Sequence, residues 1–514
     1  MKNTRSFLLW SLCSVAACAS EARFGDGDGD GNDDDIVLDA DGARYLSDLA
    51  WLSSSNGSGP VELDRTSGTA LAGDGDPISI DGVVHPKGLG VHAPSELRFL
   101  LGGACTRFRA SVALEDPALS GSVMFEVRAD GVMLHDSGLL DADAPPRDID
   151  VDVTGRLELE LVVNDGGDGA VGDGAVWASA RLHCAIDAPQ PPPRAALAWQ
   201  MIALVIRGTD VTFTDPASAE ARRVVTHMTP EEEAAAQLSL RAMPRNIHDW
   251  TDGLGSASLD IVTVDDTVRS LSPAQGGYWV GPADVADLLD RYAPTGAYDS
   301  IFVIWDPDGS EGNVPTCCFF GQGPGPGTHG ATYASIPTFS DRPSDRPGLA
   351  LIHEWLHGST YYYRKTRGFA VPDPHDGAQY GYVGDAEEIA WYTAIMDGTL
   401  EHLDTGVRKG MDATVWASGT PSRPVGTTMG PPSHLTAVAG SDGISLAWTA
   451  NSLAHGYAIY RRVDGAELEP RATTIGTAWL DVDVTPGARH EYVVRSTGSG
   501  GTESHDSAPV AASP

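Results

Sequence analysis

Residues 348–357 read Gly-Leu-Ala-Leu-Ile-His-Glu-Trp-Leu-His and contain the pattern His-Glu-x-x-His. Side chains four residues apart lie on the same face of an α-helix, so His353 and His357 can direct their imidazole rings at one ion. Two imidazoles at this spacing suit Zn²⁺, which bonds histidine nitrogen at about 2.0–2.1 Å. Glu354 follows the first histidine and can take a proton from a water molecule on the metal. The stretch therefore predicts a zinc site on a helix, with Glu354 as the catalytic base.

The residues around this pattern favour a helix. Asp345 and Pro347 precede it and form a helix start signal. Apolar side chains then recur at helical spacing, namely Leu349, Ile352, Trp355 and Leu356. The alternative interpretation is a pair of histidines packed on a half-buried helix without a metal.

A third protein ligand would complete the site. Metzincins need a histidine at 363 and a glycine at 360 in this numbering, and the chain has Tyr363 and Thr360, which excludes that class. His375 lies on a loop stiffened by Pro372 and Pro374, and it is the predicted third ligand.

Acidic residues after the loop leave other ligands open. A thermolysin-like enzyme takes a glutamate from a second helix, and Glu387 or Glu388 could supply it. Asp376 is a further alternative, and Asp373 or Asp376 could instead orient the ring of His375. A hydrogen-bond donor to the reaction's oxyanion is also expected. Three residues are candidates for it: Tyr380, Tyr382 and His329.

The elements before the motif indicate a mixed α/β region. The patterns predict strands at 202–206, 259–264 and 300–305, helices at 230–243 and 284–292, and an edge strand at 331–339. This order resembles the catalytic half of a zincin, and the resemblance implies a zincin-like domain over residues 195–425. In that fold, an edge strand beside the cleft hydrogen-bonds an extended peptide. The adjacent Cys317 and Cys318 allow a strained disulfide, free thiols or pairing between chains.

The bulk composition bounds the possible functions. A chain of 514 residues predicts about three domains. Its formal charge is −37, from 71 acidic and 34 basic residues, and no basic patch is evident, which argues against nucleic acid as a partner.

The N-terminus predicts export. Residues 1–17 have a basic start and an apolar run too short to span a bilayer permanently. Val-Ala-Ala-Cys at 15–18 resembles a bacterial lipobox. The resemblance implies that residues 1–18 are a lipoprotein-type signal peptide and that Cys18 is lipidated. The protein would then contact the membrane only through this lipid anchor. Ordinary cleavage between small residues is the competing interpretation, so the protein is expected to be a cell-surface or outer-membrane lipoprotein, or secreted. Residues 19–42 form an acidic, Asp/Gly-rich linker.

Residues 43–185 read as an all-β domain, with alternating runs broken by Asp-Gly turns. Four stretches resemble the NPCBM family: Tyr-Leu-Ser-Asp-Leu-Ala-Trp at 45–51, Lys-Gly-Leu-Gly-Val-His-Ala-Pro-Ser at 87–95, Asp-Ser-Gly at 136–138 and Asp-x-Gly-Asp-Gly at 165–169. The resemblance implies a galactose-binding-like jelly roll, a β-sandwich that holds a glycan on its loops. The sugar-contacting residues are not determined; the candidates are Trp51, Asp48, His92 and Trp177. Cys105 and Cys184 lie near the two ends of this domain and are expected to form a disulfide, which an exported protein permits.

A Pro-rich linker at 186–194 separates this domain from the next. Residues 431–514 resemble fibronectin type III, a second β-sandwich. The resemblance rests on Trp448, on Gly-Tyr-x-Ile-Tyr-Arg at 456–461 and on Glu-Tyr-x-Val at 491–494. It implies Trp448 in the core, Tyr492 as a tyrosine corner, and a spacer or adhesion role without catalysis.

Together these patterns predict a multidomain, exported zinc metallopeptidase that hydrolyses peptide bonds. Its N-terminal module would direct it to glycoproteins or a glycan-bearing surface. Two alternatives stay open: a glycan-binding adhesin without catalysis, and a zinc hydrolase that cleaves a non-peptide amide by the same attack of water.

Overall fold

The computed structural model describes residues 43–69, 72–115, 121–185, 199–274, 276–309, 312–316, 320–338, 346–384, 387–403, 408–424, 429–451, 454–498 and 503–514. The predicted signal peptide, acidic linker, Pro-rich linker and the Cys317–Cys318 pair lie outside these residues. Among the described helices, none has both the length and the apolar character needed to cross a membrane.

The N-terminal sandwich, residues 43–185, consists of strands with one short 3-10 helix, η1 (Leu46–Asp48). Its strands are β1 (Arg44–Tyr45), β2 (Ser53–Ser55), β3 (Glu62–Leu63), β4 (Ser79–Ile80), β5 (Val83–Val84), β6 (Gly88–His92), β7 (Ser95–Leu100), β8 (Cys105–Leu114), β9 (Ser122–Ala129), β10 (Val132–Asp141), β11 (Arg147–Asp152), β12 (Glu158–Asn164) and β13 (Gly174–Cys184). One sheet has the order β11-β8-β13-β6-β3, with β1 also on β13, and the other begins β10-β9-β12-β7-β2. The expected β-sandwich is therefore present.

The core of this sandwich forms between its two sheets. Trp177 is fully buried there and packs edge-on against Phe125, with ring centroids 5.0 Å apart. The expected pair Cys105 and Cys184 is joined by a disulfide across β8 and β13. It closes a loop of 79 residues, for which the chain-entropy model gives roughly 4 kcal/mol of stabilisation.

The central region, residues 199–424, is a mixed α/β structure. Its elements are β14 (Trp199–Thr214), β15 (Ala221–His227), α1 (Pro230–Trp250), β16 (Ala257–Val268), β17 (Ser272–Ala274), β18 (Gly277–Trp279), η2 (Pro282–Val285), α2 (Ala286–Tyr292), β19 (Ser300–Trp305), β20 (Asp308–Gly309), β21 (Gly312–Asn313), β22 (Phe320–Gln322), η3 (Pro326–Thr328), β23 (Thr332–Pro337), α3 (Leu349–Lys365), η5 (Gly377–Tyr380), α4 (Glu388–Asp397), β24 (Leu400–Glu401), β25 (Arg408–Lys409) and α5 (Ala413–Trp416). Strands β16, β14, β19 and β23 are parallel neighbours in that order, and β22 is antiparallel beside β23.

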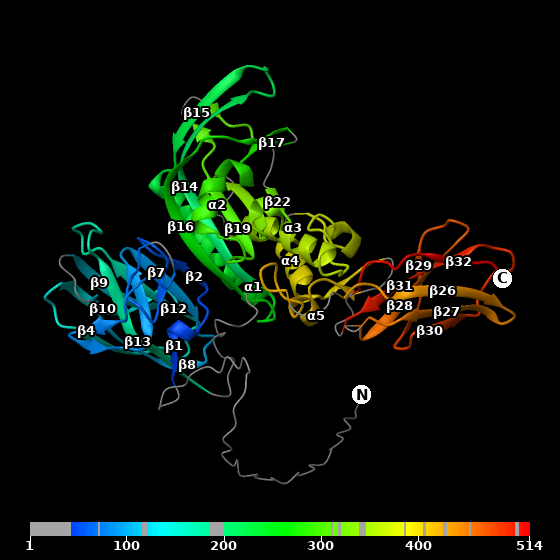
Figure 1. Ribbon diagram of the computed structural model, residues 1–514, viewed down its shortest axis with the longest axis horizontal. Coiled ribbons are helices and arrows are strands. Elements are labelled where there is room, and N and C mark those ends of the chain that lie inside the picture. Colours follow the sequence, from blue (N-terminus) through cyan, green and yellow to red (C-terminus); the bar gives the residue numbers. More distant parts are fainter. Residues whose placement is uncertain are drawn as a thin grey trace, which may run out of the picture. The chain divides into compact units, whose positions relative to one another are not determined.

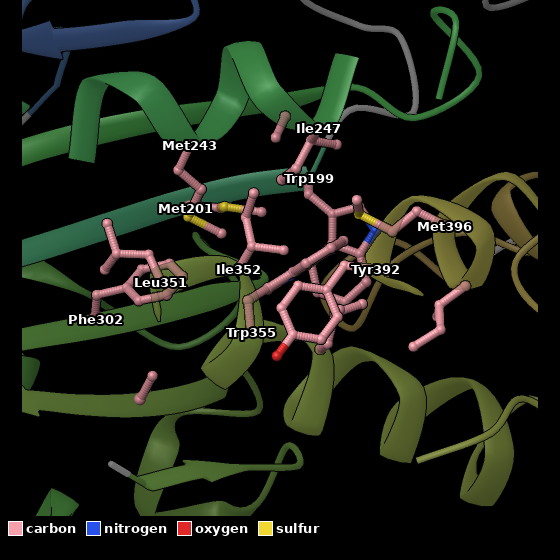
Figure 2. Packing of buried hydrophobic residues seen from close by; sticks show 14 of the residues in the cluster. Trp199, Met201, Met243, Ile247, Phe302, Leu351, Ile352, Trp355, Tyr392 and Met396 are labelled. Atoms are coloured by element: carbon pink, nitrogen blue, oxygen red, sulfur yellow. The ribbon is translucent and has the colours of Figure 1, made fainter. Parts of the chain in front are cut away.

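Helices cover both faces of this sheet because the strand side chains alternate between them. On β14, Met201 and Ala203 belong to a core with α1 and α3, whereas Ile202 and Leu204 belong to a core with α2. Figure 2 shows the first core, with side chains of α1, α3 and the sheet gathered around Trp199. The ring of Trp199 lies 5.2 Å from that of Trp355, edge to face. The first of these cores fixes α3, the helix of the His-Glu-x-x-His pattern, against the sheet.

The predicted edge strand at 331–339 is wrong. Strand β23, residues 332–337, is fully buried and paired on both sides, with β19 and with β22. The strand at the end of the sheet is β22, which directly precedes a stretch rich in glycine and proline and for which the sequence predicts no element. Three residues of strand without apolar alternation leave no periodic signal, so pairing with β23 decides the structure here.

Other predicted elements differ mainly in length. Helix α1 begins as predicted, with Thr229 as its N-cap in a capping box with Glu232. It continues through Pro244 to Trp250, because its apolar face packs on the sheet. The helix predicted at 284–292 is divided into η2 and α2. Helix α3 begins at Leu349 after Gly348, whose φ of 82° is in the left-handed region that glycine tolerates.

Strand β2 joins the N-terminal sandwich to the central sheet. It pairs antiparallel with β7 and parallel with β16, so one sheet of eleven strands runs through both parts. The Trp51 indole N–H donates to Asp260 at 2.8 Å, and Asp260 also accepts from Ser54 at 2.8 Å and from Tyr298 at 2.9 Å. Trp51 is therefore occupied by a contact with the central region.

The C-terminal sandwich, residues 433–512, has two sheets that face each other (Figure 1, orange and red). One sheet contains β26 (Ser433–Gly440), β27 (Gly443–Thr449) and β30 (Ala478–Asp481), and the other contains β28 (Gly456–Val463), β29 (Glu469–Thr474), β31 (His490–Thr497) and β32 (Val510–Ala512). Trp448 and Tyr492 are both in the core. The Tyr492 hydroxyl donates to Asp481 at 2.8 Å, which ties the start of β31 to the end of β30.

Candidate metal centre

Helix α3 holds the two motif histidines on one face. Its apolar residues turn into the core, which leaves His353 and His357 half-buried. The helix lies close to the sheet at Gly358, where a Cβ atom would meet Thr332 Cβ at 2.7 Å and the Gln322 carbonyl oxygen at 2.9 Å. Glycine at this position therefore sets how near the motif lies to strand β22.

Three histidines come together at this face of the helix. The potential ligand atoms of His353, His357 and His375 all lie within 4.8 Å of one another. The Nε2 atoms of His353 and His357 are 3.2 Å apart. Two nitrogens that bind one tetrahedral zinc at about 2.0–2.1 Å are separated by roughly 3.3 Å, so this spacing suits zinc.

His353 is oriented by a hydrogen-bond chain from α4. Its Nδ1 atom is hydrogen-bonded to the Tyr392 hydroxyl, and that hydroxyl donates to Glu388 Oε1 at 2.7 Å. When Nδ1 carries the proton, the lone pair is on Nε2, the atom that faces His357. Glu388 therefore lies two hydrogen bonds behind the first histidine of the cluster, with the Tyr392 hydroxyl between them.

The other two histidines share a carboxylate. Asp373 Oδ1 lies 3.8 Å from His357 Nδ1 and 3.5 Å from His375 Nδ1. Its second oxygen lies 3.6 Å from the Arg364 guanidinium. This arrangement turns both Nδ1 atoms towards Asp373 and leaves both Nε2 atoms available to a metal.

Glu354 is buried beside the cluster. Its side chain is 3% exposed, Oε1 is 3.7 Å from His353 Nε2, and Oε2 has no hydrogen-bond partner. Burial raises the pKa of Glu354 to about 8, and a hydrogen bond from the Gly321 backbone N–H on β22 opposes that rise. A buried carboxylate oxygen without a partner is costly. The other oxygen, Oε1, faces the cluster, so the carboxylate lies where a base for a metal-bound water is needed.

The electrostatics favour neutral imidazoles. Burial, together with the neighbouring His357 and His375, lowers the pKa of His353 to about 4. Burial also lowers the pKa of His357. A lower pKa favours the uncharged ring, which is the form that binds a metal.

These residues fit a zinc ion. Three imidazoles converge, polar partners engage their Nδ1 atoms, and an unpartnered carboxylate oxygen lies alongside. Three protein ligands would leave a coordination position for water or substrate, as in catalytic zinc sites.

The acidic alternatives for the third ligand make other contacts. Glu388 accepts from Tyr392, Glu387 Oε2 accepts from the Val383 N–H at 2.7 Å, and Asp376 Oδ2 accepts from the Asp373 N–H at 3.0 Å. His375 is the residue that the described chain brings into the cluster.

The three predicted oxyanion donors make contacts outside the histidine cluster. His329 is tied at both ring nitrogens, to the Ala293 carbonyl oxygen at 2.6 Å and to Asp290 at 3.0 Å, so it is not available as a donor. Tyr380 and Tyr382 both pack on Trp391, with ring centroids 5.4 Å away in each case.

The candidate sugar contacts of the N-terminal sandwich also have structural roles. Trp177 is core, and Trp51 binds Asp260. Asp48 pairs with Lys87 at 2.6 Å, and the His92 ring lies 3.0 Å from the Ala93 carbonyl oxygen. Asp48 and His92 are partly exposed, whereas Trp51 and Trp177 are buried.

Two contributions to the site were missed in the sequence. Tyr392 carries no metal-ligand signal, although its position four residues after Glu388 on a helix places both on one face. The Gly321 N–H comes from the unrecognised strand β22.

Replacing Tyr392 with phenylalanine is expected to weaken zinc binding by about 10-fold to 100-fold, because His353 loses the partner that fixes its ring. Competition with a chromophoric chelator would measure the affinity. Tyr382→Phe is the matched control, since Tyr382 packs on the same Trp391. Equal zinc affinities for the two variants would show that the hydrogen-bond chain does not support the site.

Several comparisons with known proteins concern the N-terminal sandwich. A family model described as NPCBM/NEW2 domain matches residues 42–183. A protein of Renibacterium salmoninarum, whose name assigns it to the endo-alpha-N-acetylgalactosaminidases, is 37% identical over 150 residues, which are 29% of this chain. The chain spans about a tenth of that relative, since the match covers 10% of its length.

Solved structures were also matched. CBM51 from Clostridium perfringens GH95, in complex with methyl-galactose, is 33% identical and covers 27% of this chain and 99% of its own, with a TM-score of 0.26. The M60 catalytic domain with the CBM51-1 and CBM51-2 domains from Clostridium perfringens ZmpB is 27% identical and covers 36% of this chain and 19% of its own, with a TM-score of 0.25. From the family match and the observed β-sandwich, the N-terminal part of the chain is an NPCBM/NEW2 domain of the carbohydrate-binding-module type.

Proposed function

We propose that the chain is an exported zinc metallopeptidase whose N-terminal sandwich directs it to glycoproteins or a glycan-bearing surface. The observation that carries this proposal is the cluster of His353, His357 and His375 with the buried carboxylate of Glu354 beside it. The resemblance of the central region to a zincin supports it. So does the sheet order, in which parallel strands end in an antiparallel edge strand next to the helix of the motif.

The three histidines would hold the zinc ion. When bound, zinc acts as a Lewis acid that activates water and polarises a carbonyl group. Glu354 accepts the proton of the attacking water on its carboxylate, of which Oε1 lies nearest to His353, and then delivers it to the leaving amine. Tyr392 and Asp373 keep the imidazole rings in the required orientation.

Strand β22 offers a place for an extended peptide. It is the last strand of its sheet among the described residues, so one of its edges is not paired with another described strand. A Cβ atom added at Gly321 would meet the Glu354 carbonyl oxygen at 2.1 Å, which shows how closely the strand approaches the motif. A peptide paired with this edge would pass beside the histidine cluster.

The N-terminal sandwich supports the proposed glycan target. It is of the carbohydrate-binding-module type, and one matched structure was solved with methyl-galactose. Because β2 also pairs with β16, the glycan-binding sandwich would be attached to the central sheet by backbone hydrogen bonds and not only by a flexible linker. We therefore propose a galactose-containing glycan as its ligand.

Cleavage of casein and mucin by the purified full-length chain tests the proposed activity. Cleavage is expected with zinc, is expected to stop after the metal is removed with a chelator, and is expected to return when zinc is added back. Zinc binding without cleavage of either protein would contradict the peptidase and favour the alternative of an adhesin, or of a hydrolase that cleaves another amide.

A further inference from the structure

The segment that follows α3 pairs with a loop of the C-terminal sandwich. Residues 368–370 lie beside residues 503–505, and Phe369 and Ser504 form an antiparallel bridge. Two backbone hydrogen bonds flank the bridge, from Ala370 N to Glu503 O and from His505 N to Gly368 O. Backbone hydrogen bonds therefore join the C-terminal sandwich to the segment that leads to His375.

Glu503 anchors this loop inside the sandwich. Its side chain is 3% exposed, and its carboxylate accepts from the Tyr460 hydroxyl at 2.8 and 2.9 Å and from Arg495 at 2.8 Å. The Arg495 guanidinium also lies 4.2 Å from the centre of the Tyr460 ring. A buried carboxylate held by a cation and a hydroxyl fixes the backbone that carries it.

Gly368 is enclosed by the start of the sandwich. Its φ is 79°, and a Cβ atom there would meet the Met429 carbonyl oxygen at 3.2 Å and Gly430 Cα at 3.2 Å. Both the chain that enters the sandwich and the loop at 503–505 therefore touch the same turn after α3.

Only a short, stiff connection separates this turn from the cluster. Phe369 and Val371 are buried, and Pro372 and Pro374 restrict the backbone. The Pro374 carbonyl oxygen accepts from the Trp391 indole N–H at 2.6 Å. Because the prolines restrict the backbone between the two stretches, we expect a displacement of residues 368–370 to be passed on to residues 373–375.

The ring of His375 depends on this backbone for its position. Its side chain is 71% exposed, whereas those of His353 and His357 are each 19% exposed. Its ring lies 3.5 Å from Asp373, a residue of the same segment. The two helix histidines are fixed by the core, but the third is fixed by the path of the loop.

We infer that the C-terminal sandwich contributes to the metal centre. Through Glu503, the sandwich sets the position of His375 and Asp373. Arg495 and Glu503 are positioning residues, because they act through the loop and touch no ligand atom. The inference rests on the proposed function, since it concerns the same zinc site.

Zinc affinity in a double-mutant cycle tests the inference in the full-length chain. Arg495→Met is expected to weaken zinc binding by about 10-fold. In a His375→Ala background, the same substitution is expected to change the affinity by less than about twofold, because the ligand through which it acts is absent. Arg471→Met is the matched control, since Arg471 pairs with Asp483 elsewhere in the same sandwich. It is expected to leave the affinity unchanged in both backgrounds.

If Arg495 had only a structural role, the Arg495 and Arg471 variants would both melt at a lower temperature and would bind zinc with equal affinity. That result would overturn the inference but not the proposed function. The same holds if Arg495→Met weakens binding equally with and without His375. If Arg495→Met does not fold, Tyr460→Phe takes its place, with an expected loss of about threefold that again requires His375. Failure of the unmodified chain to bind zinc would overturn the proposed function together with the inference.

Discussion

Replacing Glu354 with glutamine is expected to lower turnover by about a thousandfold while the chain still binds zinc. Glutamine keeps the size of the side chain but cannot accept the proton of the attacking water, and general base catalysis contributes about 10²–10⁴-fold. Glu354 is next to the ligands but is not among the three histidines that converge. The loss should therefore appear in kcat with casein or mucin as substrate, with little change in KM.

The same variant should fold at least as well as the unmodified chain. Glu354 is buried with one oxygen unpartnered, so an uncharged side chain of equal size relieves a desolvation cost. Glu401→Gln, on the exposed residue of β24, is the matched control and should leave turnover unchanged. Full turnover by Glu354→Gln with zinc bound would remove Glu354 from the role of base.

Replacing His357 with alanine is expected to weaken zinc binding by about a thousandfold or more. A site of this type gains roughly 10–16 kcal/mol from its ligands, so losing one of three removes several kcal/mol. His357 lies at the centre of the cluster, 3.2 Å from His353 between Nε2 atoms and 4.7 Å from His375 between ring centroids. Equilibrium dialysis followed by mass spectrometry of the metal would measure the loss.

His329→Ala is the control for this variant, because His329 belongs to the same region but is bound to Ala293 and Asp290. It should keep one zinc ion per chain. If His357→Ala also kept one ion at low micromolar free zinc, the ion would have to be held elsewhere, and the cluster would not be the metal site.

The helix of the motif could be predicted from sequence because its signals are local. Apolar residues at helical spacing place Ile352, Trp355 and Leu356 in the core, and the same periodicity turns His353 and His357 to the other side. Capping residues likewise predicted the start of α1 at Pro230. The β-sandwich of residues 43–185 followed from alternating runs and turns.

The features that depend on distant contacts could not be predicted. The sequence left His375, Glu387 and Glu388 open as ligands, because the fold of the loop decides which of them meets the helix. Strand β22 has no signal in the sequence, since three residues carry no period and acquire strand structure only beside β23. Trp51 was a sugar candidate, and its partner Asp260 is 209 residues away.

The C-terminal sandwich illustrates the same limit. Its resemblance to fibronectin type III implied a β-sandwich with Trp448 in the core and Tyr492 as a tyrosine corner, and both side chains lie in the core. Its pairing with residues 368–370 involves backbone groups of Glu503 and His505, which any residue carries. A proposed role in the metal centre therefore emerges from the three-dimensional structure alone.

Zinc stoichiometry and X-ray absorption of the purified full-length chain test the central claim most directly. One zinc ion per chain is predicted, with three imidazole nitrogens at about 2.0–2.1 Å in its coordination sphere. A chain that stays free of zinc at saturating concentrations, or an ion whose coordination sphere contains no imidazole, would contradict the account.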